Sequence, residues 1–182
     1  KTSPKRGFSD GNFMVEFKEE NPQELMLHYG NMESGMQEKN LNLNNCSMIR
    51  GKTTCDTNVN LNEYNGEQIE YWFSLADIAN GSAESRHLNL EVDTEDPVII
   101  DINYTINERV VNFNIVIDED NFDGAEYFDE NDRSPMWKPL CSRLRDNICS
   151  ARKTFSLGEH DLSIQVFDKA GNSVAEDISF II

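Results

Sequence analysis

The stretches IEYWFSLADIANGS at residues 69–82 and HDLSIQVFDKAGNS at residues 160–173 align without a gap at an offset of 91 residues. Their apolar positions fall every second residue, so that Ile69, Tyr71, Phe73 and Leu75 align with His160, Leu162, Ile164 and Val166. Three of these four pairs are apolar in both copies, which is typical of a half-buried strand. Asp77 and Asp168 then open a short polar turn in each copy. We therefore predict one structural unit that occurs twice.

The length and the charge limit the classes of protein and of partner. The 182 residues divide at the repeat into a first domain at 1–92 and a second at 93–182, each of about 90 residues and near the lower end of usual domain size. The formal net charge of -17 argues against nucleic acid and anionic membrane surfaces as partners, because both would repel the chain. No run approaches the roughly 20 apolar residues of a membrane span, so we expect no membrane insertion.

Four cysteines occur as two local pairs, Cys46 with Cys55 and Cys141 with Cys149, at equivalent places in the two copies. The spacing is too wide for a zinc knuckle and no histidine lies beside either pair in the sequence. We predict one disulfide per domain, each stabilising its domain by about 2–3 kcal/mol in the chain-entropy model. The alternative is four reduced thiols in a cytosolic protein. Disulfides place the chain in an oxidising, extracellular or cell-surface setting.

The remaining chain contains short alternating segments separated by turns. Examples are FMVEF from residue 13, LMLHY from residue 25 and VVNFNIVI from residue 110. We interpret the acidic run 118–132 as a solvated loop, and we assign no long helix because no segment keeps a helical period. About seven short strands per 90 residues indicate an all-β chain of two tandem immunoglobulin-like β-sandwiches. The local disulfides are expected to close one loop each, and not to bridge two sheets as in antibody domains.

Two motifs carry a family resemblance that covers nearly the whole chain. VDTEDPVI at 92–99 resembles the spacer that opens each module in tandem immunoglobulin-like arrays of bacterial and archaeal surface proteins, and FDKAGNSV at 167–174 resembles their D-x-A-G-N motif. The first copy departs from the motif, with DIANGS in place of DKAGNS. The cysteine loops are more similar to the archaeal versions. The resemblance implies secreted or anchored stalk and adhesion modules.

Asp77 and its counterpart Asp168 have two interpretations. An aspartate can bond the backbone amides of its own turn, which is a purely structural role. The alternative is a calcium ion, the one cofactor we consider, held where the domains join by Asp77, Asp93, Glu95 and Asp96. That site requires the turn at Asp77 to lie at the same end of the sandwich as the joint.

Three sequons make Asn45, Asn80 and Asn103 candidate glycosylation sites, of which Asn80 on its turn is the best acceptor. Catalytic residues are not apparent. None of the three histidines has a nucleophile at a recognisable spacing, and no zinc-protease, nucleophile-elbow or phosphate-loop motif occurs. We interpret Trp72 and Trp137 as packing residues.

We expect a non-enzymatic stalk or adhesion module of a cell-surface or secreted protein, with a protein or surface glycan as partner. The alternative is an accessory region of an exported protease or glycosidase whose catalytic domain lies outside this sequence. Both hypotheses rest on architecture, because fold alone does not give function.

Overall fold

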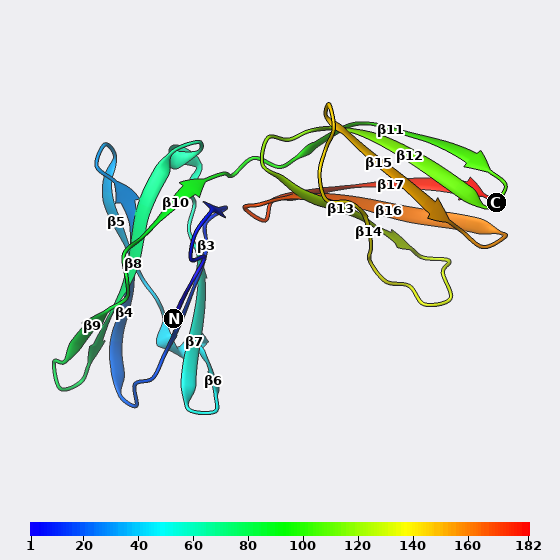
Figure 1. Cartoon of the computed structure of the whole chain (residues 1–182). Helices are drawn as coiled ribbons and strands as arrows, with labels where there is room; N and C mark the ends of the chain where they lie inside the picture. Colours follow the sequence, from blue (N-terminus) through cyan, green and yellow to red (C-terminus); the bar gives the residue numbers. More distant parts are fainter. The chain divides into compact units, whose positions relative to one another are not determined.

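The computed structural model describes all 182 residues and divides them into two compact units, Lys1–Thr94 and Glu95–Ile182. Both units are built of antiparallel sheets, with one parallel strand pair in unit 1 (Figure 1). The only helical elements are two single turns of 3-10 helix, η1 (Leu43–Asn45) and η2 (Asn62–Tyr64). The prediction of an all-β chain of two tandem sandwiches is confirmed. Each unit is described below by itself.

Unit 1 contains two sheets, with strand orders β1-β3-β7-β6 and β2-β10-β8-β4-β5, and β9 also pairs with β8. Its strands are β1 (Thr2–Ser3), β2 (Phe8–Ser9), β3 (Asn12–Phe17), β4 (Pro22–Asn31), β5 (Gly35–Asn40), β6 (Ser47–Ile49), β7 (Lys52–Asn58), β8 (Gln68–Asp77), β9 (Ser82–Glu84) and β10 (Leu88–Val92).

Unit 2 contains a three-stranded sheet, β11-β12-β15, and a four-stranded sheet, β14-β13-β16-β17. Its strands are β11 (Val98–Asn107), β12 (Val110–Asp118), β13 (Phe122–Asp129), β14 (Lys138–Cys141), β15 (Ile148–Thr154), β16 (Glu159–Asp168) and β17 (Ser173–Ile181). This is the three-plus-four arrangement of a seven-stranded sandwich.

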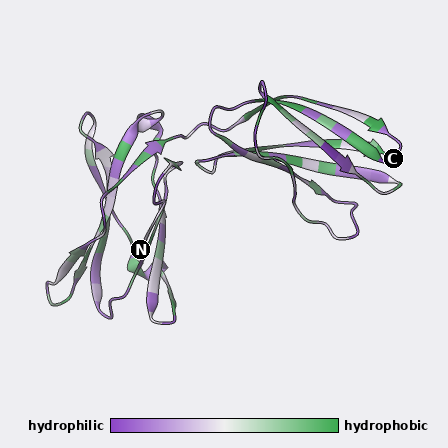
Figure 2. Ribbon diagram, in the orientation of Figure 1, coloured by the Kyte–Doolittle hydropathy of each residue, from purple (hydrophilic) through white to green (hydrophobic).

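The repeated stretch forms an interior strand in both units. In unit 1 it is β8, which lies between β10 and β4, and in unit 2 it is β16, which lies between β13 and β17. Ile69, Tyr71 and Phe73 of β8 and Leu162, Ile164 and Val166 of β16 are buried in their respective cores. Apolar and polar residues accordingly alternate along the strands (Figure 2). The strand predicted from the repeat is confirmed in both copies.

Two segments differ from the prediction. Residues 118–132 are not a solvated loop, because β13 runs through them as an interior strand and buries Ala125, Tyr127 and Asp129. The acidic residues of this segment concealed its alternation. In β11, a register shift between Ile99 and Asp101 turns Ile100 outward, where it is 61% exposed. Such a bulge changes which residues of the strand face the core, and a period-two pattern in the sequence does not predict it.

Candidate functional site

Both predicted cysteine pairs form disulfides. Cys46 is joined to Cys55 with a Cα–Cα distance of 4.5 Å, and Cys141 is joined to Cys149 with a Cα–Cα distance of 5.9 Å. Cys55 and Cys149 are buried in β7 and β15, while their partners are partly exposed. No free cysteine remains.

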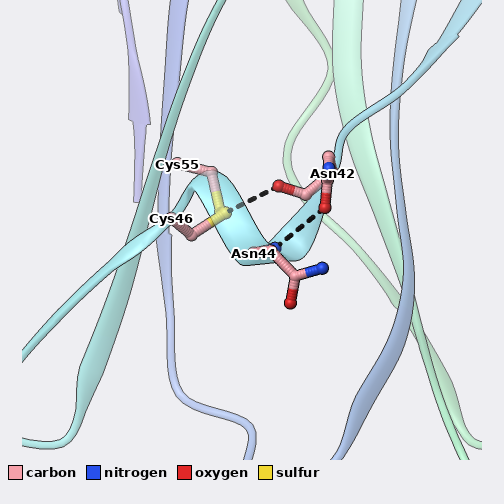
Figure 3. Close-up of a disulfide and its surroundings, with 4 residues drawn as sticks. All are labelled: Asn42, Asn44, Cys46 and Cys55. Atoms are coloured by element: carbon pink, nitrogen blue, oxygen red, sulfur yellow. Dashed lines mark hydrogen bonds between the residues drawn. A yellow bond between two sulfur atoms is a disulfide. The ribbon is translucent and has the colours of Figure 1, made fainter.

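The prediction that each disulfide closes a loop without joining two sheets holds in unit 1 and is wrong in unit 2. Cys141 ends β14 of the four-stranded sheet, and Cys149 lies in β15 of the three-stranded sheet, so this disulfide links the two layers of unit 2. In unit 1, Cys46 lies where the chain crosses from β5 in one sheet to β6 in the other, directly after η1 (Figure 3). Asn42 caps η1, because its side-chain oxygen accepts the Asn44 N–H at 3.0 Å. Cys46 directly precedes β6 and lies opposite Cys55 of the neighbouring strand β7, since Ser47 pairs with Thr54, so the unit 1 disulfide closes the β6–β7 hairpin within one sheet.

The aspartate that follows the repeated strand is used inside its own turn. The Asp168 Oδ1 atom accepts the backbone N–H groups of Ala170, Gly171 and Asn172 at 2.8, 2.6 and 2.9 Å, and its Oδ2 atom accepts the Asn172 side-chain amide at 2.7 Å. Asp168 is buried. These four bonds support the structural interpretation of this residue.

The first copy reaches the same geometry with a different sequence. The Asp77 Oδ1 atom accepts the N–H groups of Ala79 and Gly81, both at 2.8 Å. Asn80 adopts a positive φ of 62°, and Gly171, at the aligned position, has a φ of 109°. Asparagine and glycine are the residues that tolerate this conformation best. The exchange of DKAGNS for DIANGS therefore preserves the turn.

The structure does not bring together all the residues of the predicted calcium site. β8 and β10 are antiparallel, with Gln68 paired with Glu91, so the chain leaves β10 toward Asp93 beside the beginning of β8. Asp77 ends β8, nine residues and about 30 Å further along the strand. The inclusion of Asp77 was wrong, because it lies at the opposite end of unit 1. A role for Asp93, Glu95 and Asp96 in binding calcium stays a prediction.

All three candidate glycosylation sites are exposed, and they lie in different local structures. Asn45 is the last residue of η1, Asn80 lies in the turn after β8, and Asn103 lies within β11. Asn103 also donates its side-chain amide to the Asp101 carboxylate. Glycosylation of these residues stays a prediction.

A buried histidine–aspartate pair lies inside unit 2, and no sequence motif predicts it. His160 occupies the position aligned with Ile69, is 3% exposed, and lies with its Nδ1 atom 2.7 Å from the Oδ2 atom of Asp129, which is 2% exposed. The Nε2 atom of His160 lies 3.0 Å from the backbone oxygen of Ser156. Both ring nitrogens of His160 thus face oxygen atoms that can accept a hydrogen bond.

This arrangement has the residue types of a catalytic triad without its geometry. In a triad, the second ring nitrogen takes a proton from the nucleophile's hydroxyl group. Here that nitrogen instead donates to the Ser156 backbone carbonyl, so His160 has no lone pair directed at a hydroxyl. The pair is therefore structural, with His160 packed edge-on to Phe155 at a ring-centroid distance of 5.0 Å.

The outer face of unit 1 carries a three-ring stack. His28 of β4 is the cross-strand partner of Trp72 of β8, and their rings lie parallel at 4.8 Å. His87 stacks on Trp72 as well, at 4.0 Å. The Nδ1 atom of His28 lies 3.2 Å from a Glu38 oxygen, and that of His87 lies 3.1 Å from a Glu70 oxygen. Trp72 is thus a packing residue as predicted, although it packs on the sheet surface and not in the core.

Trp137 differs from Trp72 in its surroundings. It is 41% exposed and lies 5.6 Å, centroid to centroid, from Phe128. It therefore packs only partly, and the second tryptophan prediction holds less well than the first.

Two carboxyl groups of unit 2 have perturbed titration. The Ser179 hydroxyl donates to Asp161 at 2.6 Å and the Asn131 amide donates to it at 2.9 Å, and these bonds lower the pKa of Asp161 below its usual value. The ammonium group of Lys138 hydrogen-bonds to Asp132 and lowers the pKa of that carboxyl in the same way.

Comparisons with known proteins give the fold and no family. No family model matches the chain, and no curated protein matches it. Among solved structures, the chicken CNTN1 FN1-FN3 domains match with a TM-score of 0.61 and 11% identity over 97% of this chain. This chain spans 64% of the length of that one. The fibronectin(III)-like modules of Clostridium thermocellum CbhA match with a TM-score of 0.47 and 8% identity, over 99% of this chain and 91% of theirs.

The sheet topology and the likeness to the CNTN1 domains define the fold class of the chain. The chain consists of two tandem β-sandwiches of the immunoglobulin-like and fibronectin type III-like class, each with one disulfide. No helix in the structure is long and apolar enough to cross a membrane.

Proposed function

We propose that this chain is a non-catalytic module of a secreted or cell-surface protein, which spaces or presents other parts of that protein and docks a protein or a surface glycan. The disulfides support this setting, since such bonds persist in oxidising compartments. The surface-protein origin follows from the resemblance of the spacer and turn motifs to those of prokaryotic, especially archaeal, surface arrays.

The observation that carries the proposal is the position of the disulfides. In unit 2 the Cys141–Cys149 bond fastens β14 of one sheet to β15 of the other, and in unit 1 the Cys46–Cys55 bond fastens the edge of the β6–β7 hairpin. The Cys141–Cys149 bond resists separation of the two sheets of unit 2, and the Cys46–Cys55 bond resists opening of the β6–β7 hairpin of unit 1. A module that transmits force or holds a fixed spacing needs this property.

The interior of unit 2 supports a non-catalytic role as well. Its one histidine–aspartate pair is buried and directed at a backbone carbonyl. The aspartates of the two repeated turns are occupied by backbone amides. The titratable groups that stand out in the two copies therefore have structural partners.

Single-molecule pulling from the two termini tests the proposal. We expect the oxidised chain to unfold in two discrete events, at higher force than the reduced chain. Reduction should lengthen the two extension steps by about 27 and about 22 Å, from 9 and 8 residue intervals at about 3.5 Å each less the Cα–Cα distances across the disulfides. If the oxidised chain extends without discrete unfolding steps, a role in transmitting force is contradicted. That result would favour the alternative, an accessory region of an exported enzyme.

A further inference from the structure

Unit 2 contains a cavity of about 300 Å³ that no part of the proposed function uses. It lies where the turn between β11 and β12, the segment between β13 and β14, and the connection from β15 to β16 meet. The lining includes the carboxylates of Asp129 and Asp132. Its other polar side chains, apart from His160, are cationic or carry hydroxyl groups: Arg109, Tyr127, Arg133, Lys138, Thr154 and Ser156.

The charges that line the cavity do not cancel. Lys138 is paired with Asp132, and His160 is paired with Asp129. Arg109 and Arg133 remain, and neither forms an ion pair with a carboxylate of the chain. The cavity thus keeps two unpaired guanidinium groups in a protein with a formal net charge of -17.

One of the two guanidinium groups is held in place. The Nε–H of Arg109 donates to the backbone oxygen of Phe155 at 3.0 Å, which orients the group and leaves its terminal nitrogens without a protein acceptor. Arg133 is exposed in the segment after β13. A planar guanidinium group matches a carboxylate through two parallel hydrogen bonds, which makes a carboxylate the fitting ligand.

The rest of the lining offers hydroxyl groups. Thr154 and Ser156 contribute theirs from the end of β15 and the residues after it. Tyr127 is 5% exposed, and burial raises the pKa of its hydroxyl above the usual value, so the group stays neutral and can both donate and accept. Phe155, which is buried, contributes an aromatic ring to the lining.

We propose that this cavity binds a sugar acid of monosaccharide size. Arg109 and Arg133 bind its carboxylate, and Thr154, Ser156 and Tyr127 exchange hydrogen bonds with its hydroxyl groups. The volume lies at the lower end of the range for ligand sites, which fits one sugar ring and not a larger ligand. The assignment holds whether the chain serves as a stalk or as an accessory region, so it goes beyond the proposed function.

Chemical-shift titration of the ¹⁵N-labelled full chain tests the site. Glucuronate is the probe, glucose is its uncharged counterpart of the same size, and sodium sulfate is the inorganic anion. We expect glucuronate to shift amide resonances around Arg109, Thr154 and Ser156, and the affinity to fall as salt is added. Glucose should cause no such shifts, and sulfate should bind at least ten-fold more weakly than glucuronate.

Matched variants make the test specific. Arg133→Gln should weaken glucuronate binding at least ten-fold, and Arg152→Gln, an exposed residue of β15 outside the cavity with the same change of charge, should leave it unchanged. Arg133 is exposed and forms no ion pair, so its variant will fold. The assignment would be overturned if glucuronate caused no amide shifts, or if glucose or sulfate bound as tightly as glucuronate. It would also be overturned if the Arg133 and Arg152 variants lost the same glucuronate affinity. None of these results would affect the pulling experiment.

Discussion

Replacing the buried His160–Asp129 pair should show that unit 2 depends on both partners together and on neither alone. The two side chains are 3% and 2% exposed and 2.7 Å apart. The aligned position in unit 1 holds Ile69 in place of His160, which shows that this strand accepts an apolar residue there. The informative changes are His160→Ile, Asp129→Val and the two combined.

The expected magnitudes follow from what each change leaves behind. His160→Ile leaves a carboxylate buried without its partner, and the loss of one partner of a buried ion pair costs about 3–5 kcal/mol. For a domain of this size that lowers the unfolding midpoint by at least about 12 °C. Asp129→Val should cost less, about 2–3 kcal/mol, because the neutral imidazole can remain. The double variant should lie within about 1 kcal/mol of the parent, because an apolar pair needs no desolvation of charge.

Each unit has its own fluorescent reporter, since Trp72 lies in unit 1 and Trp137 in unit 2. Denaturant unfolding of the three variants in a Trp72→Phe background therefore reports on unit 2 through Trp137. The free energies form a double-mutant cycle. The ion-pair account would be refuted if both single variants lost less than about 1 kcal/mol of unfolding free energy. It would also be refuted if the loss in the double variant equalled the sum of the two single losses.

Three further outcomes follow from the contacts. Asp168→Ala removes the acceptor of four hydrogen bonds and should destabilise unit 2 by about 2–3 kcal/mol in denaturant unfolding, and a loss below about 0.5 kcal/mol would contradict the turn-shaping role. Ser179→Ala removes the main hydrogen bond that lowers the pKa of Asp161, so NMR titration should show that pKa rise. Because the folded-state pKa of Asp161 is lowered, its stabilisation is present above the unfolded pKa and is lost as pH falls through the folded pKa, and the variant should lose it at a higher pH. Tyr64→Phe should leave the midpoint of unit 1 unchanged or raise it, because the Tyr64 hydroxyl is buried without a hydrogen-bond partner, and a clear loss of stability would reveal a partner, such as a bound water molecule.

The sequence predicted the strand framework well because alternation and burial coincide in most of the chain. The repeat located β8 and β16, and the apolar residues Val111, Phe113 and Ile115 of β12 are all buried as their spacing indicated. The prediction from the sequence failed where polar residues lie in the core. Asp129 adds to the acidic composition of β13 and is nevertheless buried, because His160 of the neighbouring strand β16 lies within hydrogen-bond distance of its carboxylate.

The candidate sites depend on information that a sequence pattern lacks. The direction of a strand decides at which end of the sandwich the following turn lies. Because β8 and β10 are antiparallel, Asp77 at the end of β8 lies far from the segment after β10. The partner of His28 follows from the register between β4 and β8, which places Trp72 opposite it. The cavity beside Arg109 and Arg133 combines residues far apart in the sequence, and no local motif marks it.

Thiol labelling under denaturing conditions, read by intact mass before and after reduction, tests the central claim most directly. Cys55 and Cys149 are buried, the Cys141–Cys149 disulfide joins the two sheets of unit 2, and the Cys46–Cys55 disulfide closes a hairpin in unit 1. The chain prepared without reductant should therefore take up no label, and it should take up four labels after reduction. Thermal unfolding of the same samples should show each unit less stable by about 2–3 kcal/mol once reduced. Four labels without prior reduction, in protein made in an oxidising compartment, would contradict the disulfide-fastened sandwiches and the extracellular setting proposed from them.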